Sequence, residues 1–559
     1  MTTPQGSFWK SKRMVSLAIT LCFAVILTIG MINSGSYGIG YDQNPEQNIL
    51  FMNLRPYFQL LLGADDPRTE MLGDEDVCES IERDHGAAPM YIAAPFCVSH
   101  SFRDNPGKWI IAYRCCVFFI FWLGLIALYL LTKRLTDNPL FSMFAVGALW
   151  LSPRFFAEST YNNKDALALA CVLVSIYFGY RFYEAQGKGI LYPVLFGITS
   201  AFSVNVRITG IVLLGLIGLA YMIRVTFFDK WNSKYFLKGV IAIASFVLSF
   251  YLITPAMWHG HALSFVKYVT VESASFSRWD NYLMAAGEIF KPSIKPIPWW
   301  YVISFMFVTI PPLVSIIFLI GIVTVTAGLF LKKRDKEKTD NIFVFSILMF
   351  WVSVIVFSIV SHTNLYNGWR QLYSLYAPMI VTGVYGAKCL YDRLIASKNA
   401  NVVKTVFGSL FAMQLAGCLF FICLNHPHEY AYFNIFAGKN VQEKWDGDYW
   451  GVGTRAVFEE LHRREGTCTV SSFDNMMLVL TELYLGEEIL SDIEVVDFPD
   501  SDYIAFNRTY SNYYVRSMND ALVEMDEDTT VIVAELLQTE PVFEIKSGNC
   551  TLWSVYERP

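Results

Sequence analysis

The chain contains a succession of apolar runs that are long enough to cross a lipid bilayer. A membrane-spanning helix needs about 20 mostly apolar residues, and residues 14–32 supply the first run directly after Lys12 and Arg13. Further runs lie at 109–131, 139–153, 165–183, 190–206, 208–228, 239–257, 303–331, 341–361, 373–390 and 402–424. We therefore expect an all-α polytopic membrane bundle of about 11 transmembrane helices, in which 139–153 and 190–206 are the shortest members.

Composition supports the same class of protein. Hydrophobic residues make up 54% of the 559 residues and charged residues 16%, whereas an ordinary soluble protein has roughly 25% charged residues. Such a chain has too little polar surface to cover its apolar side chains in water. The composition excludes a disordered, collagenous or nucleic-acid-binding chain.

The distribution of positive charge predicts the orientation of the bundle. Basic residues stand at successive loops that share one predicted side, namely Lys133, Arg134, Lys188, Lys230, Lys234, Lys238, the run 331–338, Arg393 and Lys398. Cytoplasmic loops carry such an excess, so we expect a cytoplasmic N-terminus and an extracytoplasmic C-terminus, in the plasma (inner) membrane. A cleaved signal peptide competes with an uncleaved first helix, but no A-x-A site follows residue 32.

We expect two domains, a transmembrane domain over 1–424 with its first large external loop at 33–108, and an extracytoplasmic domain over 425–559. The tail has the pattern of a small α/β domain. Helical spacing is present at 453–464, and short β-branched runs at 467–473, 493–498, 502–506 and 529–534 favour strands.

The positions of the cysteines fit this division. Cys78 and Cys97 share the first external loop, and Cys468 and Cys550 share the tail. Two disulfides are therefore compatible with an oxidising compartment, and free thiols remain the alternative for both pairs.

Polar residues gather beside helix ends on the predicted outer face. The first cluster, YDQNPEQ at 41–47, has Asp42 and Glu46 four residues apart, which places them on one face if the segment is helical. A turn or helix cap followed by solvated acid is the plainer interpretation.

The second cluster, SPRFFAESTYNNKD at 152–165, contains Glu158, Lys164 and Asp165 before an apolar run. Asp165 could cap that helix, and a capping acid at the membrane surface is also well placed for chemistry. Arg154 and Lys164 are candidates for contacts with anionic lipid head groups, although such residues often serve only as snorkelling anchors.

Two arginines are candidates for binding phosphate. Arg370 in YNGWRQLY lies between Trp369 and an apolar run, where a guanidinium offers several donors to phosphate oxygens or anchors the chain at the interface. Arg207 lies between two apolar runs. Ionisable groups at such positions are costly and indicate a functional role.

Other signatures of soluble enzymes are weak or missing from the sequence. His426 and His428, in HPHEYAYFN just before DGDYWG, have a spacing that is poor for a metal site, and a packed junction with the tail explains the segment better. The sequence has no P-loop, no strand-linked G-x-G-x-x-G and no H-E-x-x-H.

In combination and in this order, the clusters resemble the C-type (GT-C) membrane glycosyltransferases related to dolichyl-phosphate-mannose protein mannosyltransferases (glycosyltransferase family 39), in their bacterial branch. The resemblance is carried by YDQNPEQ, SPRFF…NNKD, NVRITG, IPWWY, YNGWRQLY, HPHEYAYFN and DYWG, over about 40–450. The motif that contains Arg370 commonly begins with an acid in this family, where the chain has Asn367.

The resemblance implies transfer of a hexose or pentose from a polyprenyl (undecaprenyl or dolichyl) phosphate donor to a lipid, glycan or protein acceptor on the outer face. The implied catalytic acids are Asp42 and Asp165. The substrate-binding candidates are Glu46, Glu158, Lys164, Arg207 and Arg370.

The expected mechanism uses Asp42 as the general base, which removes the acceptor proton, and positive groups that stabilise the charge on the leaving phosphate. Asp165 and Glu158 would orient the sugar or the acceptor. No metal or other cofactor is required, and no ligand set in the sequence supports a divalent cation. The rival hypothesis is a transporter or flippase of lipid-linked sugars, in which Arg207 lines the pathway; a structural partner in an envelope complex is a second.

Overall fold

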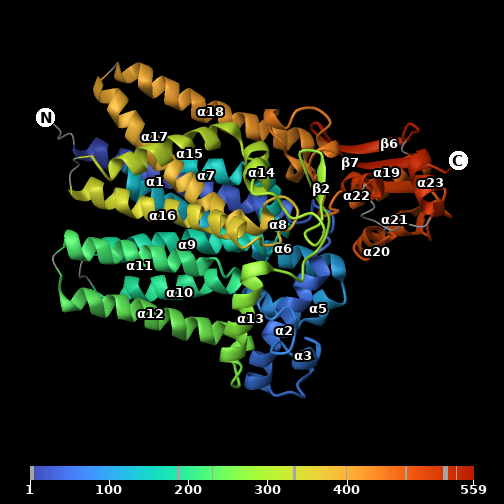
Figure 1. Ribbon diagram of the computed structural model, residues 1–559, viewed down its shortest axis with the longest axis horizontal. Coiled ribbons are helices and arrows are strands. Elements are labelled where there is room, and N and C mark those ends of the chain that lie inside the picture. The colour runs from blue at the N-terminus through green and yellow to red at the C-terminus, as the bar shows by residue number, and fades with distance from the viewer. Residues whose placement is uncertain are drawn as a thin grey trace.

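The computed structural model describes residues 5–185, 189–229, 231–331, 335–397, 399–472, 475–519, 527–536 and 538–558. Three basic residues used to predict the orientation, Lys188, Lys230 and Lys398, lie outside this part of the chain, as does the segment 332–334. The described chain forms a long helical bundle with a small sheet-containing domain beyond one end (Figure 1).

Every predicted apolar run contains helix. The bundle is built from α1 (Gln5–Asn33), α6 (Pro106–Thr136), α7 (Pro139–Trp150), α8 (Pro153–Tyr161), α9 (Asp165–Glu184), α10 (Leu191–Val206), α11 (Gly210–Phe227), α12 (Ser233–Ile253), α14 (Tyr301–Thr309), α15 (Pro312–Gly328), α16 (Asp335–Val360), α17 (Tyr376–Ser397) and α18 (Ala400–Asn425). Local hydrophobicity and caps set many of these limits; Asn105 and Asn138, for example, each cap a helix that begins with proline.

The number of clear spans is smaller than the sequence suggested. Within the described residues, seven helices are long and apolar enough to cross a membrane, or eight if α7 and α8, which meet at a 67° bend, form one broken span. The predicted single span at 303–331 is interrupted at Pro311 and Pro312, because proline cannot continue the hydrogen-bonded ladder of a helix. The apolar helices still identify the chain as an integral membrane protein.

Glycines allow two helices of the bundle to pack closely. Gly321 of α15 faces the backbone of α17, and a Cβ added there would lie 2.4 Å from the carbonyl oxygen of Thr382. Gly386 of α17 approaches Gly321 just as closely. Small residues at such crossings increase the packing contacts between helices in membranes. The buried core continues along the bundle through residues such as Phe118, Phe144 and Ile347.

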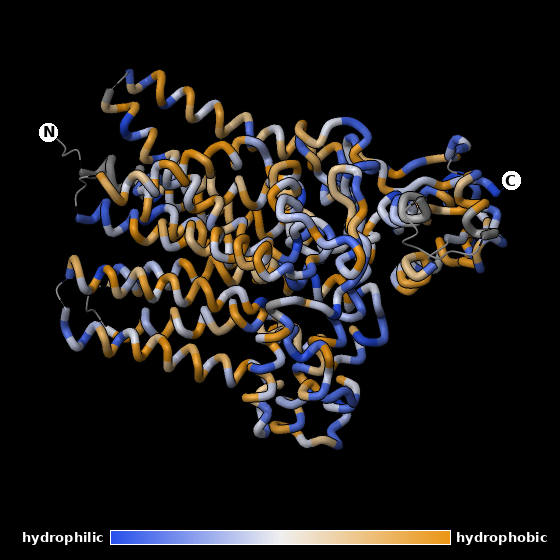
Figure 2. The backbone as a smooth tube through the Cα atoms, in the orientation of Figure 1, coloured by the Kyte–Doolittle hydropathy of each residue, from blue (hydrophilic) through white to orange (hydrophobic). Residues whose placement is uncertain are grey.

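Polar segments concentrate at the end of the bundle opposite the N-terminus, as the hydropathy colouring shows (Figure 2). The first external loop forms α2 (Gln43–Leu62), α3 (Pro67–Glu70), η1 (Ala88–Ala93), α4 (Ala94–Cys97) and α5 (His100–Arg103). It packs near η2 (Pro255–Met257) and α13 (Ala262–Ser275). The hairpin of β1 (Leu283–Ala285) and β2 (Glu288–Phe290) packs instead against Tyr513 of the tail. The 3-10 turn η3 (Arg370–Leu375) leads into α17, and three further turns, η4 (Glu429–Ala431), η5 (Ile435–Ala437) and η6 (Val441–Glu443), join the bundle to the tail.

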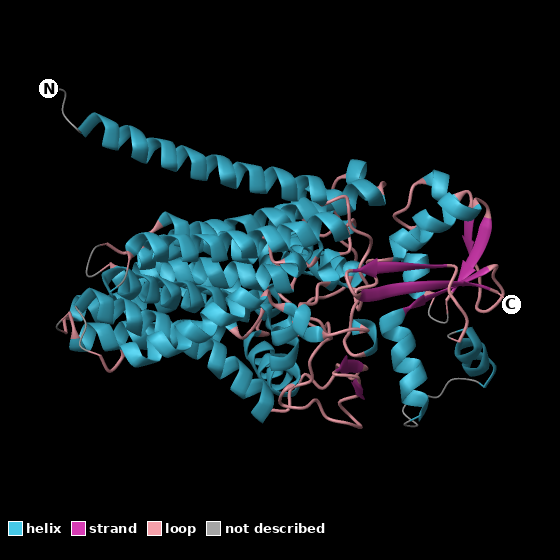
Figure 3. Ribbon diagram, turned by 90° about the horizontal axis from the view of Figure 1, so that it is seen from above, coloured by secondary structure: helices cyan, strands magenta, loops and turns pink. Residues whose placement is uncertain are grey.

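The C-terminal region forms a mixed five-stranded sheet with helices around it, at the far end of the molecule from the N-terminus (Figure 3). Its elements are α19 (Thr454–Glu465), β3 (Cys468–Ser471), α20 (Met476–Glu482), α21 (Glu487–Leu490), β4 (Ile493–Val495), β5 (Tyr503–Asn507), α22 (Arg508–Asn519), α23 (Glu527–Leu536), β6 (Phe543–Ser547) and β7 (Cys550–Glu557). The strand order is β4-β3-β5-β7-β6, with β4, β3 and β5 parallel and β7 antiparallel to its neighbours.

One predicted strand in the tail is wrong. Residues 529–534 are β-branched, yet they belong to helix α23. Val533 and Leu536, three positions apart, are buried against Ile504 and Phe506 of β5, while Val531 is 53% exposed. Burial of one helical face therefore outweighs the intrinsic strand preference of these residues.

Neither suggested disulfide forms in the structure, where all four cysteines are free thiols. Cys468 is on β3 and Cys550 on β7, and β5 lies between them. Two strand spacings of about 4.8 Å separate the cysteines by more than a disulfide can span. Cys97 is buried in one cluster of the first loop, and Cys78 packs at the edge of another.

Candidate active site

An ion pair joins the first external loop to the segment before α17. Asp42 directly precedes α2, and Arg370 begins η3. Nη1 of Arg370 donates to Oδ2 of Asp42 at 2.7 Å. The Arg370 side chain is 5% exposed and that of Asp42 is 35% exposed. The guanidinium is therefore buried, whereas the carboxylate remains partly exposed.

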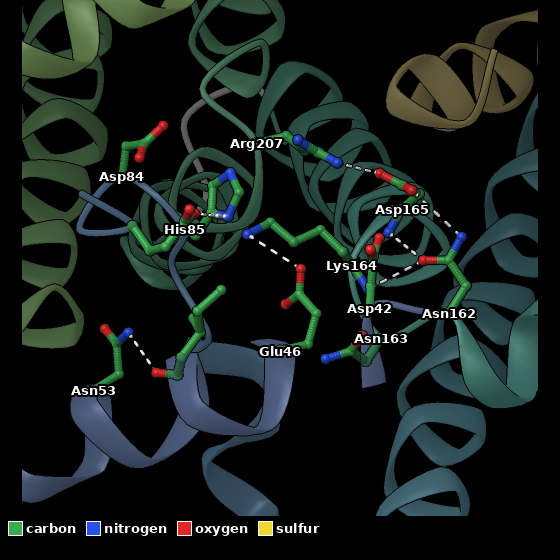
Figure 4. A network of polar contacts seen from close by, with 12 residues as sticks. Asp42, Glu46, Asn53, Asp84, His85, Asn162, Asn163, Lys164, Asp165 and Arg207 are labelled. Carbon is green, nitrogen blue, oxygen red and sulfur yellow. Dashed lines mark hydrogen bonds and ion pairs between the residues drawn. The ribbon is translucent and has the colours of Figure 1, made fainter. Parts of the chain in front are cut away.

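A second pair lies at the start of α9. Asp165 is the first residue of that helix, and it accepts a hydrogen bond from Nη2 of Arg207, which follows α10 (Figure 4). Asn162 fixes the acid, because its Oδ1 accepts from the backbone N–H of Asp165 at 2.8 Å. The Asp165 side chain is only 2% exposed.

A third, looser pair connects α2 with the same turn. Nζ of Lys164 lies 4.0 Å from Oε1 of Glu46, and Figure 4 shows the two side chains directed toward each other. Burial raises the pKa of Glu46, although Lys164 opposes the shift. Burial also lowers the pKa of Lys164, against the opposing effect of Glu46. Burial therefore makes the charged form of each side chain less favourable than it is in water.

Glu158 has a different environment from the other acids. It is 0% exposed, and it accepts hydrogen bonds from the Tyr373 hydroxyl at 2.7 Å and from Asn162 at 2.8 Å. Arg154 lies 3.8 Å away. Through Asn162, Glu158 is linked to Asp165. Its contacts in the structure are with protein groups beneath the site.

Aromatic rings surround the guanidinium of Arg370. Its central carbon lies 4.2 Å from the ring centre of Trp450, 4.4 Å from that of Tyr366 and 5.7 Å from that of Tyr449. Cations are attracted to ring faces within about 6 Å. Burial by itself lowers the pKa of Arg370, but the carboxylates of Asp42 and Asp165 more than offset this, and its pKa is raised.

The three cations retain hydrogen-bonding capacity. Among the residues that the structure describes, none accepts a hydrogen bond from Nε of Arg207, Nε of Arg370 or Nζ of Lys164, although all three atoms are buried. A buried donor without an acceptor is costly. An anionic ligand that enters the site would satisfy such donors.

A polar cavity of about 620 Å³ opens beside these pairs. Asp42 and Glu46 line one side of it, and Tyr366 lines another. Its remaining polar lining comes from Asn44, Asn48, Glu75, Glu82, His85 and Arg278. The cavity is large enough for a sugar residue with its surrounding polar contacts.

A second cavity, of about 280 Å³, is mostly apolar. Its lining comes chiefly from α11, α13, α16 and the neighbouring loops, with Ile208, Ile211, Val212, Val269, Val354, Phe357 and Leu365. Arg207 stands in its wall, and His85 and Phe276 line both cavities. The site thus has a polar cavity lined by Asp42 and Glu46 next to an apolar cavity that has Arg207 in its wall.

Sequence reasoning missed a charged group in the wall of the polar cavity. Arg278, after α13, donates to Asp84 at 2.9 Å and lies 3.5 Å from Glu82. His85 contacts Glu82 and Arg278: its Nδ1 lies 2.8 Å from Glu82 and its Nε2 lies 3.0 Å from Arg278. Burial lowers the pKa of His85. No motif spacing marks these residues, since the contacts depend on how α13 folds back over the first loop.

The segments 426–434 and 446–451, where the sequence predicts a junction between bundle and tail, do lie between the last helix of the bundle and the tail. His426 is 3.1 Å from Glu429, which also accepts a hydrogen bond from Tyr37. Asp448 accepts from Trp553 of β7 at 3.0 Å. Within the described residues, no group of three or more His, Cys, Asp or Glu side chains could hold a metal ion.

Comparisons with known proteins match a part of the sequence to a family model and the fold to several solved structures. Residues 104–258 match the sequence model of the family described as dolichyl-phosphate-mannose-protein mannosyltransferase. The crystal structure of ArnT from Cupriavidus metallidurans, bound to undecaprenyl phosphate, aligns with a TM-score of 0.45 and 11% identity, over 96% of this chain and 98% of that chain. No curated protein sequence matches the chain significantly.

The family match covers the segment that contributes Lys164, Asp165 and Arg207 to the site. Asp42 and Arg370 lie outside the matched residues. The match confirms that this chain resembles the dolichyl-phosphate-mannose-protein mannosyltransferases, in the segment from which half of the charged site is built.

Proposed function

We propose that the chain is an integral-membrane glycosyltransferase that moves a sugar from a polyprenyl-phosphate donor to an acceptor on the extracytoplasmic face. The observation that carries this proposal is that two acid–cation pairs, Asp42 with Arg370 and Asp165 with Arg207, come together beside two neighbouring cavities. Asp42 lines the polar cavity and Arg207 lines the apolar one. The family match over 104–258 supports the same reaction class.

The apolar cavity fits the first isoprene units of the donor. It lies among helices of the bundle, where a polyprenyl chain can enter from the lipid, and Arg207 in its wall meets the phosphate. The unsatisfied donors of Arg207, Arg370 and Lys164 then bind phosphate oxygens. Hexosyl and pentosyl donors, on undecaprenyl or dolichyl carriers, share this chemistry.

The polar cavity holds the sugar and the acceptor. An acceptor hydroxyl attacks the anomeric carbon, the bond from that carbon to the phosphate oxygen breaks, and the phosphate leaves with the electron pair. Asp42, which keeps an exposed edge on this cavity, takes the acceptor proton. Arg370 and Arg207 stabilise the charge that grows on the phosphate. The scheme requires no metal or other cofactor.

Binding of the donor also prepares the base. In the structure Arg370 is paired with Asp42. A phosphate group bound by Arg370 competes for the same guanidinium protons, which weakens the hold on Asp42 and leaves the carboxylate available for proton transfer. The donor therefore binds before the acceptor is activated.

The proposed orientation places this site outside the cytoplasm. The N-terminus lies at the opposite end of the bundle (Figure 1), and Arg134, which pairs with Glu184 at the end of α9, belongs to that opposite end. Positive charge there favours the cytoplasmic side of a plasma (inner) membrane.

The direct test uses purified protein in detergent, where no membrane sidedness remains. Polyprenyl phosphate donors with labelled hexoses or pentoses are incubated with extracts that contain lipid, glycan and protein acceptors. A transferase consumes the donor and labels an acceptor. A transporter or flippase leaves every donor intact, and that result would contradict the proposal.

A further inference from the structure

A buried carboxylate that the proposed mechanism does not use lies where the C-terminal domain meets the bundle. Asp446 is 0% exposed. It accepts hydrogen bonds from the Tyr513 hydroxyl at 2.5 Å, from Nδ2 of Asn367 at 3.1 Å and from the backbone N–H of Met284 at 3.2 Å. Burial raises the pKa of Asp446 to about 7, against the effect of these hydrogen bonds.

Asn367 begins the short segment that leads to Arg370, and each residue of that segment is anchored. Nδ2 of Asn367 also donates to the Tyr513 hydroxyl at 2.6 Å. The N–H of Gly368 donates to the Tyr301 hydroxyl at 3.0 Å. Nε1 of Trp369 donates to Oγ1 of Thr309 at 2.9 Å. The backbone of 367–369 therefore places Arg370 at the ion pair with little freedom.

Asp446 also begins the segment that walls Arg370 on the other side. Tyr449 and Trp450, three and four residues later, provide two of the rings around the guanidinium. The Tyr510 hydroxyl of α22 donates to the carbonyl oxygen of Tyr449 at 2.9 Å. Helix α22 thus contacts both segments that enclose Arg370, through Tyr513 and through Tyr510.

We propose that Asp446 and Tyr513 are positioning residues for Arg370, and that the C-terminal domain is therefore a structural part of the donor-phosphate site. This inference rests on the proposed function for its effect on transfer. It assigns a role in the site to α22, the helix that carries Tyr510 and Tyr513.

The hydrogen bond from Asn367 to Asp446 supplies a test, because exchanging the two side chains reverses its donor and its acceptor. With Asp446→Asn alone, two amides face the Tyr513 hydroxyl, and at least one buried donor loses its acceptor. With Asn367→Asp alone, two carboxylates stand about 3 Å apart near Tyr513 and Tyr301, and one of them must stay protonated. In the double variant Asn367→Asp/Asp446→Asn, the amide at 446 accepts from Met284 and donates to the carboxylate at 367, so the bond between the two positions is restored with its direction reversed. Only the carbonyl oxygen of Tyr282, which accepts from Nδ2 of Asn367 at 3.4 Å, loses that donor.

The experiment compares wild type, the two single variants and the double variant for kcat and for the donor KM in full-length detergent-solubilised protein. We expect each single variant to raise the donor KM at least about tenfold, the loss of one buried hydrogen bond to a charged group, and the double variant to recover most of it. Asn367→Asp should also lose activity as the pH rises, because the second carboxylate ionises, whereas the double variant should not. Asp500→Asn, at an exposed acid of the same domain, is the matched control.

Hydrogen exchange of the backbone amides at 367–373 provides a readout that does not depend on activity. Faster exchange in both single variants, restored in the double variant, supports the inference even if wild type proves to have no transferase activity, in which case only the proposed function fails. Single variants with wild-type KM and wild-type exchange would overturn the inference. A double variant no better than the singles would do the same.

Discussion

Oδ2 of Asp42 lies 2.7 Å from Nη1 of Arg370, and this contact joins two residues that are 328 positions apart in the chain. It places the predicted general base against the predicted phosphate-binding residue. Two further pairs, Asp165 with Arg207 and Glu46 with Lys164, give the site three acids and three cations. A phosphate group that enters the site adds negative charge to it and competes with the three acids for the three cations.

Asp42→Asn should abolish most transfer while leaving the donor bound. Loss of a general base costs about 10²–10⁴-fold in kcat, and Arg370 remains able to bind phosphate because the amide oxygen still accepts its hydrogen bond. Single-turnover kinetics with labelled donor measure both quantities. Asp104→Asn, at an exposed acid of the same external loop, is the control; full activity of the Asp42 variant would remove this residue as the base.

Arg370→Lys should weaken donor binding although it keeps the positive charge. A lysine lacks the planar group that lies between Trp450 and Tyr366. An ammonium still makes part of a desolvated cation–π contact, which is worth about 2 kcal/mol in full, so we expect a rise in the donor KM of up to roughly 30-fold. Steady-state kinetics across donor concentrations test this, and an unchanged KM would show that donor binding does not need the planar guanidinium.

Asp165→Asn should destabilise the fold. Removal of one partner from a buried ion pair costs about 3–5 kcal/mol, since Arg207 is left buried and uncompensated. Thermal unfolding in detergent should show a lower midpoint, and the double variant Asp165→Asn/Arg207→Gln should lose less than the sum of the single changes. Glu184→Gln breaks the exposed pair with Arg134, where about 1 kcal/mol or less is expected. Equal losses at the two pairs would contradict the assignment of Asp165 to a buried network.

Ile211→Trp should narrow the apolar cavity and discriminate between donors by the length of their lipid. Ile211 lines that cavity on α11, and an indole there occupies space that the isoprene units need. We expect the KM for long-chain donors to rise several-fold and that for short-chain analogues to change less. Leu219→Trp, on the same helix and 57% exposed, is the matched control. An equal effect on both chain lengths would place the prenyl group elsewhere.

Much of the bundle could be predicted because membrane helices are encoded locally. Each apolar run is helical, and the caps at Asn105 and Asn138 are visible in the sequence. The interruption at Pro311 and Pro312 was not predicted as a break between helices, because proline within an apolar run can either kink a helix or end it.

The candidate site could be predicted in part for a different reason. Asp42, Lys164, Asp165, Arg207 and Arg370 stood out because each occurs in a polar motif beside an apolar run, and the structure brings them together. No motif of this kind singles out the second charged group, which consists of Glu82, Asp84, His85 and Arg278. Asp446 was visible in DGDYWG, but its pairing with Asn367 depends on the fold of the tail.

The tail shows where local patterns fail. The run at 529–534 favours a strand by composition, but its helical face packs on β5. Pairing of Cys468 with Cys550 depended on a strand order that no local pattern encodes, and β5 separates them.

The central claim is that Arg370 and the neighbouring cations Arg207 and Lys164 bind the phosphate of a lipid carrier. The most direct measurement is the affinity of the purified protein for a polyprenyl phosphate and for the matching polyprenol without phosphate, in wild type and in Arg370→Gln. The account predicts that wild type binds the phosphate at least about tenfold more tightly than the alcohol, a difference of about 1.4 kcal/mol, and that the variant loses most of this preference. Equal binding of phosphate and alcohol by wild type, or an undiminished preference in the variant, would contradict it.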